Sequence, residues 1–248
     1  MTTTSNPVLG AFSRVEAKPK SYTAPALMTV EGTITKAGIL GLIFLLAFEF
    51  VWIEGNFHSS VLGLGFMGGV VGGILLGIII ARAPKTAPIL SPVYAALQGT
   101  WLGAFSFFAA QDGGAQIVLQ AGFLTIATLF VLLVAYRTGL IVVNNQFRAI
   151  LVGATAAIGS YYLLAIVLML FHIQAPGIGF QGGWVSVLLS GVIVIVAAFN
   201  LVLDFDYIAK NSGVAPKYME WYGAFSLIVT LIWLYFEILR LLMKLRGK

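Results

Sequence analysis

Seven long apolar segments dominate this sequence and limit what the chain can fold into. An α-helix needs about 20 apolar residues to cross the hydrocarbon core of a bilayer. Only 9% of the residues are charged, against about 25% in a typical soluble domain. The sequence therefore predicts an all-α integral membrane protein with seven transmembrane helices joined by short connections. The predicted spans are roughly 37–53, 60–81, 89–110, 115–136, 149–171, 183–205 and 221–243.

The first 36 residues have a different character from the rest. They are polar, contain Pro7, Pro19 and Pro25, and lack the early apolar core of a signal peptide. We expect a cytoplasmic, largely disordered N-terminal tail over 1–36, followed by a transmembrane domain over 37–248. The end of this tail, residues 26–36, is either a short interfacial helix or a plain linker, and both interpretations stay open.

Basic residues predict how the chain is oriented. The connections around Asn56, Asp112 and Gln174 contain no lysine or arginine, whereas the tail and the alternate connections contain ten. Basic residues favour cytoplasmic connections, so we expect a multi-pass protein of the cell membrane with a cytoplasmic N-terminus. The ten basic residues are Arg14, Lys18, Lys20, Lys36, Arg82, Lys85, Arg137, Arg148, Lys210 and Lys217.

The C-terminal end conflicts with this pattern. Seven spans place it outside, yet it carries Lys244, Arg246 and Lys248. Either this end is translocated despite its charge, or the last helix is re-entrant. The segment 221–243 is long enough to cross the bilayer, and we therefore favour seven full spans.

Composition also restricts the chemistry of the chain. The sequence contains no cysteine, and its two histidines, His58 and His172, fall in predicted connections. Thiol chemistry is excluded, a histidine-based metal site is disfavoured, and no hydrolase or metalloprotease motif occurs. We expect neither an enzyme nor a bound cofactor. The net charge of +5 is spread over connections that face anionic lipid, so the bilayer is an expected partner and nucleic acid is not.

Small residues recur at four-residue spacing in the second and third spans. Residues four apart share one face of a helix, and small side chains let helix backbones approach closely. We interpret these faces as packing seams between helices. They are formed by Gly65, Gly69, Gly73 and Gly77 in the second span, and by Ala95, Gly99 and Gly103 in the third.

Two aspartates at the end of the sixth span are candidate functional residues, because ionisable groups inside membrane segments often mark functional sites. Asp204 and Asp206 are about 200° apart on an α-helix. They therefore face opposite sides and cannot form a pair with each other. Each could instead be a solvated residue at the end of the helix, and for Asp206 we prefer that interpretation.

Other ionisable residues lie within or near the spans. Glu237 and Arg240 are three residues apart and can form an ion pair on one helix face. Glu49 either snorkels to the outer interface or lines a vestibule. Arg82 and Glu220 stand at span ends.

Several segments together resemble one known family. The C-terminal stretch "LDFDYIAKNSGVAPKYMEWYGAFSLIVTLIWLYFEILRLL" resembles the end of the bacterial Bax-inhibitor-like family, the YccA-like branch of transmembrane Bax-inhibitor-motif proteins. The segments "SPVYAALQGTWLGAFS", "IVLQAGFLTIATLFVLLVAY" and "MTVEGTITKAGIL" are similar to other parts of this family. The resemblance covers nearly all of the chain from about residue 28. It implies six helices packed around a central seventh, in a bacterial inner membrane.

The resemblance also implies an activity, a pH-sensitive leak of calcium across the membrane. In this family, two aspartates of the sixth and seventh helices share a proton near the cytoplasmic side. Asp204 matches the first aspartate, but Thr230 stands at the second position and cannot ionise. We expect Asp204 to be the pH sensor and a weak, transient calcium ligand. Asp206 or Glu220 could serve as its partner, with Arg82 as a nearby cation.

The same resemblance supports an alternative that does not involve transport. YccA-like relatives associate with a membrane protease, so the chain could be an interaction protein that modulates a protease or a stress response. In that case the N-terminal tail would be the natural contact. Calcium flux measured in liposomes would distinguish the two functions.

Overall fold

The computed structural model describes residues 26–172 and 183–246 and contains seven long helices in this part of the chain. The described residues form no β-strand beyond a single bridge between Leu27 and Pro216, so the predicted all-α class is confirmed. The predicted disordered tail over 1–25, the connection around Gln174 and the basic Lys248 lie outside the described residues. The helices are α2 (Val30–Gly55), α3 (Ser59–Arg82), α4 (Ala87–Gly113), α5 (Ala115–Arg137), α6 (Asn145–Leu170), α7 (Trp184–Asn211) and α8 (Met219–Arg246), with a 3₁₀ turn, η1 (Pro84–Thr86), before α4.

Six of these helices are long and apolar enough to cross a membrane, and the chain is therefore a multi-pass membrane protein. The exception is α4, which is 27 residues long but less apolar. Its sequence includes Ser91, Gln98 and Thr100 within the central turns. Ser91 is fully buried, and Thr100 donates a hydrogen bond to the backbone carbonyl of Leu97. Helix α4 thus places small and polar side chains where other helices pack against it.

The first helix begins earlier than the sequence analysis predicted. Helix α2 starts at Val30, so residues 30–36 belong to it rather than to a linker or a separate helix. Thr29 is the N-cap, and its side chain accepts a hydrogen bond of 2.9 Å from the backbone N–H of Gly32. Glu31 adds a negative charge in the first turn. Both features favour the start of a helix, which explains the position of the boundary.

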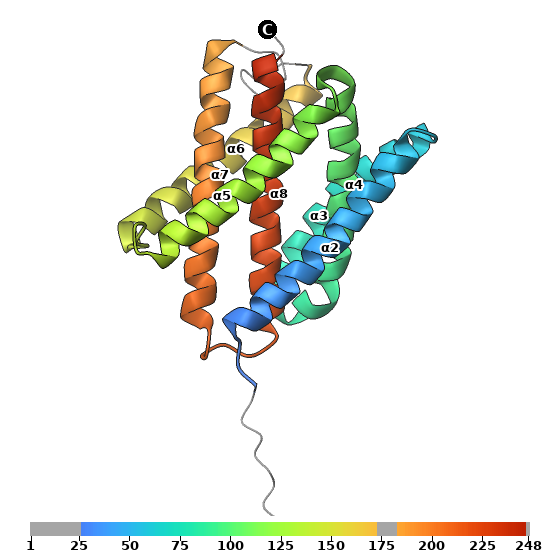
Figure 1. The fold of residues 1–248 in the computed structure, drawn as a ribbon. Helices are drawn as coiled ribbons and strands as arrows, with labels where there is room; N and C mark the ends of the chain where they lie inside the picture. The colour runs from blue at the N-terminus through green and yellow to red at the C-terminus, as the bar shows by residue number, and fades with distance from the viewer. Residues whose placement is uncertain (1–25, 173–182, 247–248) are drawn as a thin grey trace, which may run out of the picture.

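Helix α8 contains the largest number of buried residues among the helices for which the structure gives them. It packs against α2, α4, α5 and α7 (Figure 1). One face of α8 contributes Ile228 and Ile232 to a core with Leu40 of α2 and Ala95 of α4. Leu227, Leu234 and Leu239 of α8 join residues of α5 and α7 in a second core. Burial of α8 on several sides is what brings its polar residues out of contact with lipid.

The predicted packing seams are confirmed. A Cβ atom added to Gly69 would collide with the carbonyl of Leu97 and would lie 2.9 Å from the backbone nitrogen of Trp101, both on α4. Gly99 and Gly103 of α4 lie in the same way against the backbone of α2. Only glycine permits such close approach of two backbones, and these contacts hold α2, α3 and α4 together.

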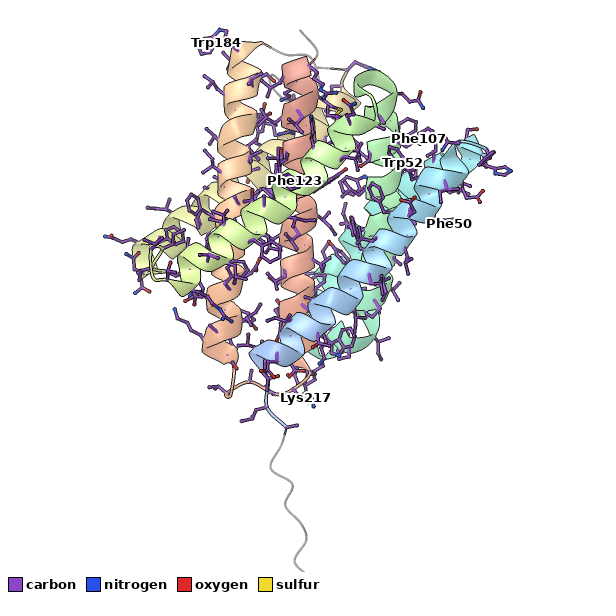
Figure 2. The ribbon with its side chains drawn as sticks, viewed as in Figure 1. Phe50, Trp52, Phe107, Phe123, Trp184 and Lys217 are labelled. Carbon is purple, nitrogen blue, oxygen red and sulfur yellow. The ribbon has the colours of Figure 1, made fainter. Side chains whose placement is uncertain are left out.

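Large apolar side chains cover the outside of the bundle, as contact with lipid requires. Phe50 on α2, Phe123 on α5 and Trp184 on α7 are exposed (Figure 2). Trp184 stands at one end of the bundle, and Lys217, in the connection between α7 and α8, stands at the other. This arrangement gives the bundle two distinct polar ends separated by an apolar surface.

The chain just before α2 is fixed to the connection between α7 and α8. The backbone N–H of Met28 donates to the carbonyl of Ala215 at 2.8 Å, and the N–H of Gly213 donates to the carbonyl of Met28 at 2.8 Å. Gly213 has a φ of 76°, a conformation that favours glycine. Met28 itself is fully buried. These contacts close one end of the bundle, the end toward which α7 carries its two aspartates.

Candidate functional site

Asp204 lies on α7 and faces α8. Its side chain is buried, with an exposed fraction of 9% for the residue. The hydroxyl of Ser226 on α8 donates a hydrogen bond of 2.5 Å to its Oδ1. Its Oδ2 is also buried and has no hydrogen-bond partner among the described residues. A buried carboxyl oxygen without a partner is costly, so Asp204 is the least satisfied acidic group on this helix.

Thr230, four residues after Ser226 on α8, lies close enough to the Asp204 carboxyl to influence it, although it does not complete a hydrogen bond to Oδ2. Residues four apart share a helix face, so Ser226 and Thr230 approach Asp204 from the same side. The structure therefore brings together Asp204 and the position at which the sequence resemblance places a second aspartate. At that position the chain offers a hydroxyl, which cannot ionise.

Asp206 faces away from Asp204, as the angle of about 200° predicts. Its Oδ2 accepts hydrogen bonds from Arg148 of α6 at 2.8 Å and from Lys210 of α7 at 2.7 Å. Tyr136 of α5 lies 3.4 Å from Oδ1. The interpretation of Asp206 as a solvated residue at a helix end is wrong, because this carboxylate is buried and lies within α7. It ties three helices together and is not a partner of Asp204.

Glu220, the other proposed partner of Asp204, is engaged elsewhere. Its buried carboxylate forms an ion pair with Lys36 of α2. It also accepts hydrogen bonds from the backbone N–H of Thr29 at 3.0 Å and from the Thr29 hydroxyl at 2.9 Å. A Cβ atom at Gly32 would collide with this carboxylate. Glu220 therefore anchors the start of α2 to the start of α8.

Two further predicted residues are exposed. Arg82 ends α3, and its side chain does not take part in any ion pair within the described part of the chain. Helix α3 packs chiefly against α4, so Arg82 is not the cation beside Asp204. The sequence analysis predicted that both residues lie on the cytoplasmic side, but that expectation does not place them next to each other in the bundle. Glu49 is exposed on α2, which agrees with a residue that snorkels to the interface.

The far half of α8 carries a second polar cluster. Glu237 and Arg240 form the ion pair that their spacing predicts, with 2.6 Å between Oε2 and Nη2, and both side chains are buried. Tyr162 of α6 donates a hydrogen bond to Oε1 of Glu237, and Trp233 donates to the same oxygen at 3.3 Å. The Arg240 guanidinium also stacks over the Tyr162 ring, 5.3 Å from its centroid. This packing gives the ion pair a hydrogen-bonded environment inside the bundle.

Sequence reasoning missed the third charged member of this cluster. Lys244 is fully buried. Its Nζ donates to Oγ of Ser190 at 2.8 Å and to the backbone carbonyl of Ser186 at 3.4 Å, both on α7. The sequence signal was available, because 237, 240 and 244 follow the three- and four-residue spacing of a single helix face.

Lys244 and Arg246, two of the three C-terminal basic residues, are thus held against the bundle. Lys244 is buried in the cluster just described, and Arg246 donates hydrogen bonds to the carbonyl of Gly113 at 2.5 Å and to Gln120 at 3.1 Å. Those two residues belong to the end of α4 and the start of α5. The end of α8 therefore lies beside the α4–α5 connection, and its start lies beside the start of α2.

The acidic residues do not gather into a metal cage. No group of three or more histidine, aspartate or glutamate side chains comes together in the described ranges, 26–172 and 183–246. Calcium prefers six to eight oxygen ligands. A cation beside Asp204 would meet one carboxylate and the hydroxyls of Ser226 and Thr230, which is a weak ligand set.

These polar sites lie within a region that matches one protein family. A family model described as "Bax inhibitor 1 like" matches residues 6–247. The chain belongs to the Bax inhibitor 1 like family. The predicted membership of the Bax-inhibitor-like family is thereby confirmed. The match includes both polar sites, so the contact between Asp204 and Thr230 and the Glu237 cluster belong to the family region of the chain. A search of curated proteins finds no match.

Proposed function

We propose that this member of the Bax inhibitor 1 like family is a pH-responsive leak for cations, calcium in particular, and that the protonation of Asp204 controls it. The observation that carries this proposal is the buried Asp204 carboxyl, which has one hydrogen-bonded oxygen and one oxygen without a partner. Carboxylates inside membrane bundles mark ion and proton pathways. When a carboxyl held in this way gains or loses a proton, the charge and the hydrogen bonding at this position change sharply.

The chemistry at this site follows from charge. The ionised carboxylate accepts the Ser226 hydrogen bond and attracts a cation to its second oxygen. The protonated form is neutral, attracts a cation less, and can itself donate a hydrogen bond. A lone carboxyl titrates in one step, whereas two close carboxyls titrate as a coupled pair. Because Thr230 stands where a second acid would be, the response should have a single step.

The proposed function also implies an arrangement of the helices in the membrane. In this arrangement α4 is a seventh span, α8 is the central helix of the bundle, and the N-terminus is cytoplasmic in a bacterial inner membrane. The length of α4 and the burial of α8 support the first two points. Alternation of basic and non-basic connections supports the third. Asp204 then lies toward the cytoplasmic end of the bundle.

The experiment that tests this function is calcium uptake by proteoliposomes. Purified protein is reconstituted around a calcium-sensitive dye, and uptake is followed across roughly pH 5 to 8, the range reached by perturbed buried carboxyls. We expect uptake above that of protein-free liposomes, with one pH-dependent step. Uptake equal to that of protein-free liposomes at every pH would contradict the proposal.

The alternative function, an interaction protein that modulates a membrane protease or a stress response, also has one supporting observation. Residues 26–28, which directly follow the tail in the sequence, are fixed to the α7–α8 connection. A protein lacking residues 1–25 keeps this anchor. Loss of protease co-purification on that truncation, with no calcium uptake by the full chain, would favour the alternative.

A further inference from the structure

One face of α8 carries polar side chains at regular intervals from Ser226 to Lys244. We call it the polar face, and its residues follow one another at alternating spacings of four and three, which keeps them on one side of a helix. From the first to the last they cover about 27 Å at 1.5 Å per residue, close to the hydrocarbon thickness of about 30 Å. The polar face consists of Ser226, Thr230, Trp233, Glu237, Arg240 and Lys244.

The polar face is turned toward α6 and α7. Ser226 contacts Asp204 of α7, Glu237 and Arg240 contact Tyr162 of α6, and Lys244 contacts Ser190 of α7. The opposite face of α8 is mostly apolar, since Ile228 and Ile232 pack with α2 and α4, and its polar contact is the hydrogen bond between Tyr235 and Ser106 of α4. The buried charged groups between Ser226 and Lys244 are thus all on the side of α8 that faces α6 and α7.

The two ends of this interface differ in charge. The end near Ser226 presents the acidic Asp204. The other end presents the Glu237–Arg240–Lys244 cluster, with one acid and two bases, all buried. A positive charge in a medium of low dielectric repels a cation strongly, and a divalent cation twice as strongly as a monovalent one.

Tyr162 forms the wall of this cluster on the side of α6. Helix α6 packs chiefly against α7 and reaches α8 through the long Tyr162 side chain, whose hydroxyl and ring contact Glu237 and Arg240. A contact made by a single side chain can break while the packing of the two helix backbones stays unchanged.

We propose that the polar face of α8 lines the route of the cation leak, and that the Glu237–Arg240–Lys244 cluster, closed by Tyr162, is a basic barrier at the end opposite Asp204. This inference rests on the proposed function. It adds a second place at which flow is limited and a residue, Lys244, that sets how strongly calcium is excluded.

The barrier is tested by Lys244→Met, which removes one positive charge and leaves the Glu237–Arg240 pair intact. We expect calcium uptake to rise on the order of tenfold, with its pH step retained because Asp204 is unchanged. Lys85→Met, at an exposed lysine in η1, is the matched control and should behave like the parent. Uptake by Lys244→Met equal to or below that of the parent would overturn the barrier.

The route is tested without measuring flux. Because the chain has no cysteine, single cysteines can be introduced at Thr230 and at Ile232, which are equally buried, 8% and 7% exposed, but lie on opposite faces of α8. We expect a membrane-impermeant cationic methanethiosulfonate to label Thr230→Cys at least about tenfold faster than Ile232→Cys. Equal labelling would overturn the route.

The two tests separate the two proposals. If the parent takes up no calcium, the proposed function fails, and the labelling ratio still decides whether water reaches the polar face. If the parent takes up calcium but labelling is equal at both positions, the proposed function stands and the inference fails.

Discussion

The hydroxyl of Ser226 on α8 donates a hydrogen bond of 2.5 Å to the carboxyl of Asp204 on α7. It joins two helices at a position where Asp204 is buried and Ser226 is half-buried. Hydrogen bonds to charged groups contribute about 1.5–3 kcal/mol. A change in the protonation of Asp204 therefore changes how firmly α7 and α8 are held together at this point.

Ser226→Ala should reveal this coupling as a loss of stability that depends on pH. The variant removes the donor, and the ionised carboxylate loses more by this than the neutral acid. We expect a loss of about 1–2 kcal/mol at high pH and a smaller loss at low pH, measured by thermal unfolding in detergent. Ser226→Thr keeps the hydroxyl and is the control. The same loss at both pH values would show that the contact does not sense the charge of Asp204.

Thr230→Asp should restore a pair of interacting acids. Thr230 already lies close to the Asp204 carboxyl, so a carboxyl at this position would meet a like charge, and the two groups would titrate as a coupled unit. Calcium uptake plotted against pH should gain a second step. The double variant with Asp204→Asn should lose that step. Identical profiles for the single and double variants would mean that the two positions do not communicate.

Glu220→Gln should loosen the start of α2. The substitution removes the charge that pairs with Lys36 while it keeps the size of the side chain. We expect faster hydrogen exchange at residues 26–36, measured by mass spectrometry, and a stability loss of about 1–3 kcal/mol. Hydrogen exchange in the part of α8 away from Glu220 should change little. Unchanged exchange at 26–36 would show that the backbone contacts to the α7–α8 connection suffice to hold this segment.

Gly69→Leu should prevent the close packing of α3 and α4. A Cβ at Gly69 already meets the backbone of α4, whereas a Cβ at the preceding residue, Gly68, meets open space. Overpacking costs about 1–3 kcal/mol even where side chains can adjust, and here backbone must move. Size-exclusion chromatography in detergent should show loss of monodisperse protein for Gly69→Leu and not for Gly68→Leu. Two well-behaved variants would place this face toward lipid.

Most of the helices could be predicted from the sequence, because lipid accepts only backbone that is hydrogen-bonded within the segment. The boundary at Val30 was missed, since Thr29 and Glu31 form a helix start in a stretch that is not apolar. Helix α4 is less apolar than the other helices for a different reason. Its polar and small residues face other helices rather than lipid.

The site was predictable only where helix geometry decided it. The divergence of Asp204 and Asp206 and the pairing of Glu237 with Arg240 both follow from angles along one helix. The partners of Asp206 and Glu220, and the distance of Arg82 from Asp204, depend on how different helices sit side by side. Spacing along the chain does not contain that information. Lys244 was misread because it was counted with the terminal charges.

The most direct test of the proposed control by Asp204 is calcium uptake by Asp204→Asn across roughly pH 5 to 8. Asparagine resembles the neutral acid in size and cannot ionise. We predict that the pH step disappears while the protein remains folded. Asp206→Asn, which loses the pairs with Arg148 and Lys210, should be less stable but keep the step. An Asp204→Asn protein with the pH profile of the parent would contradict the account.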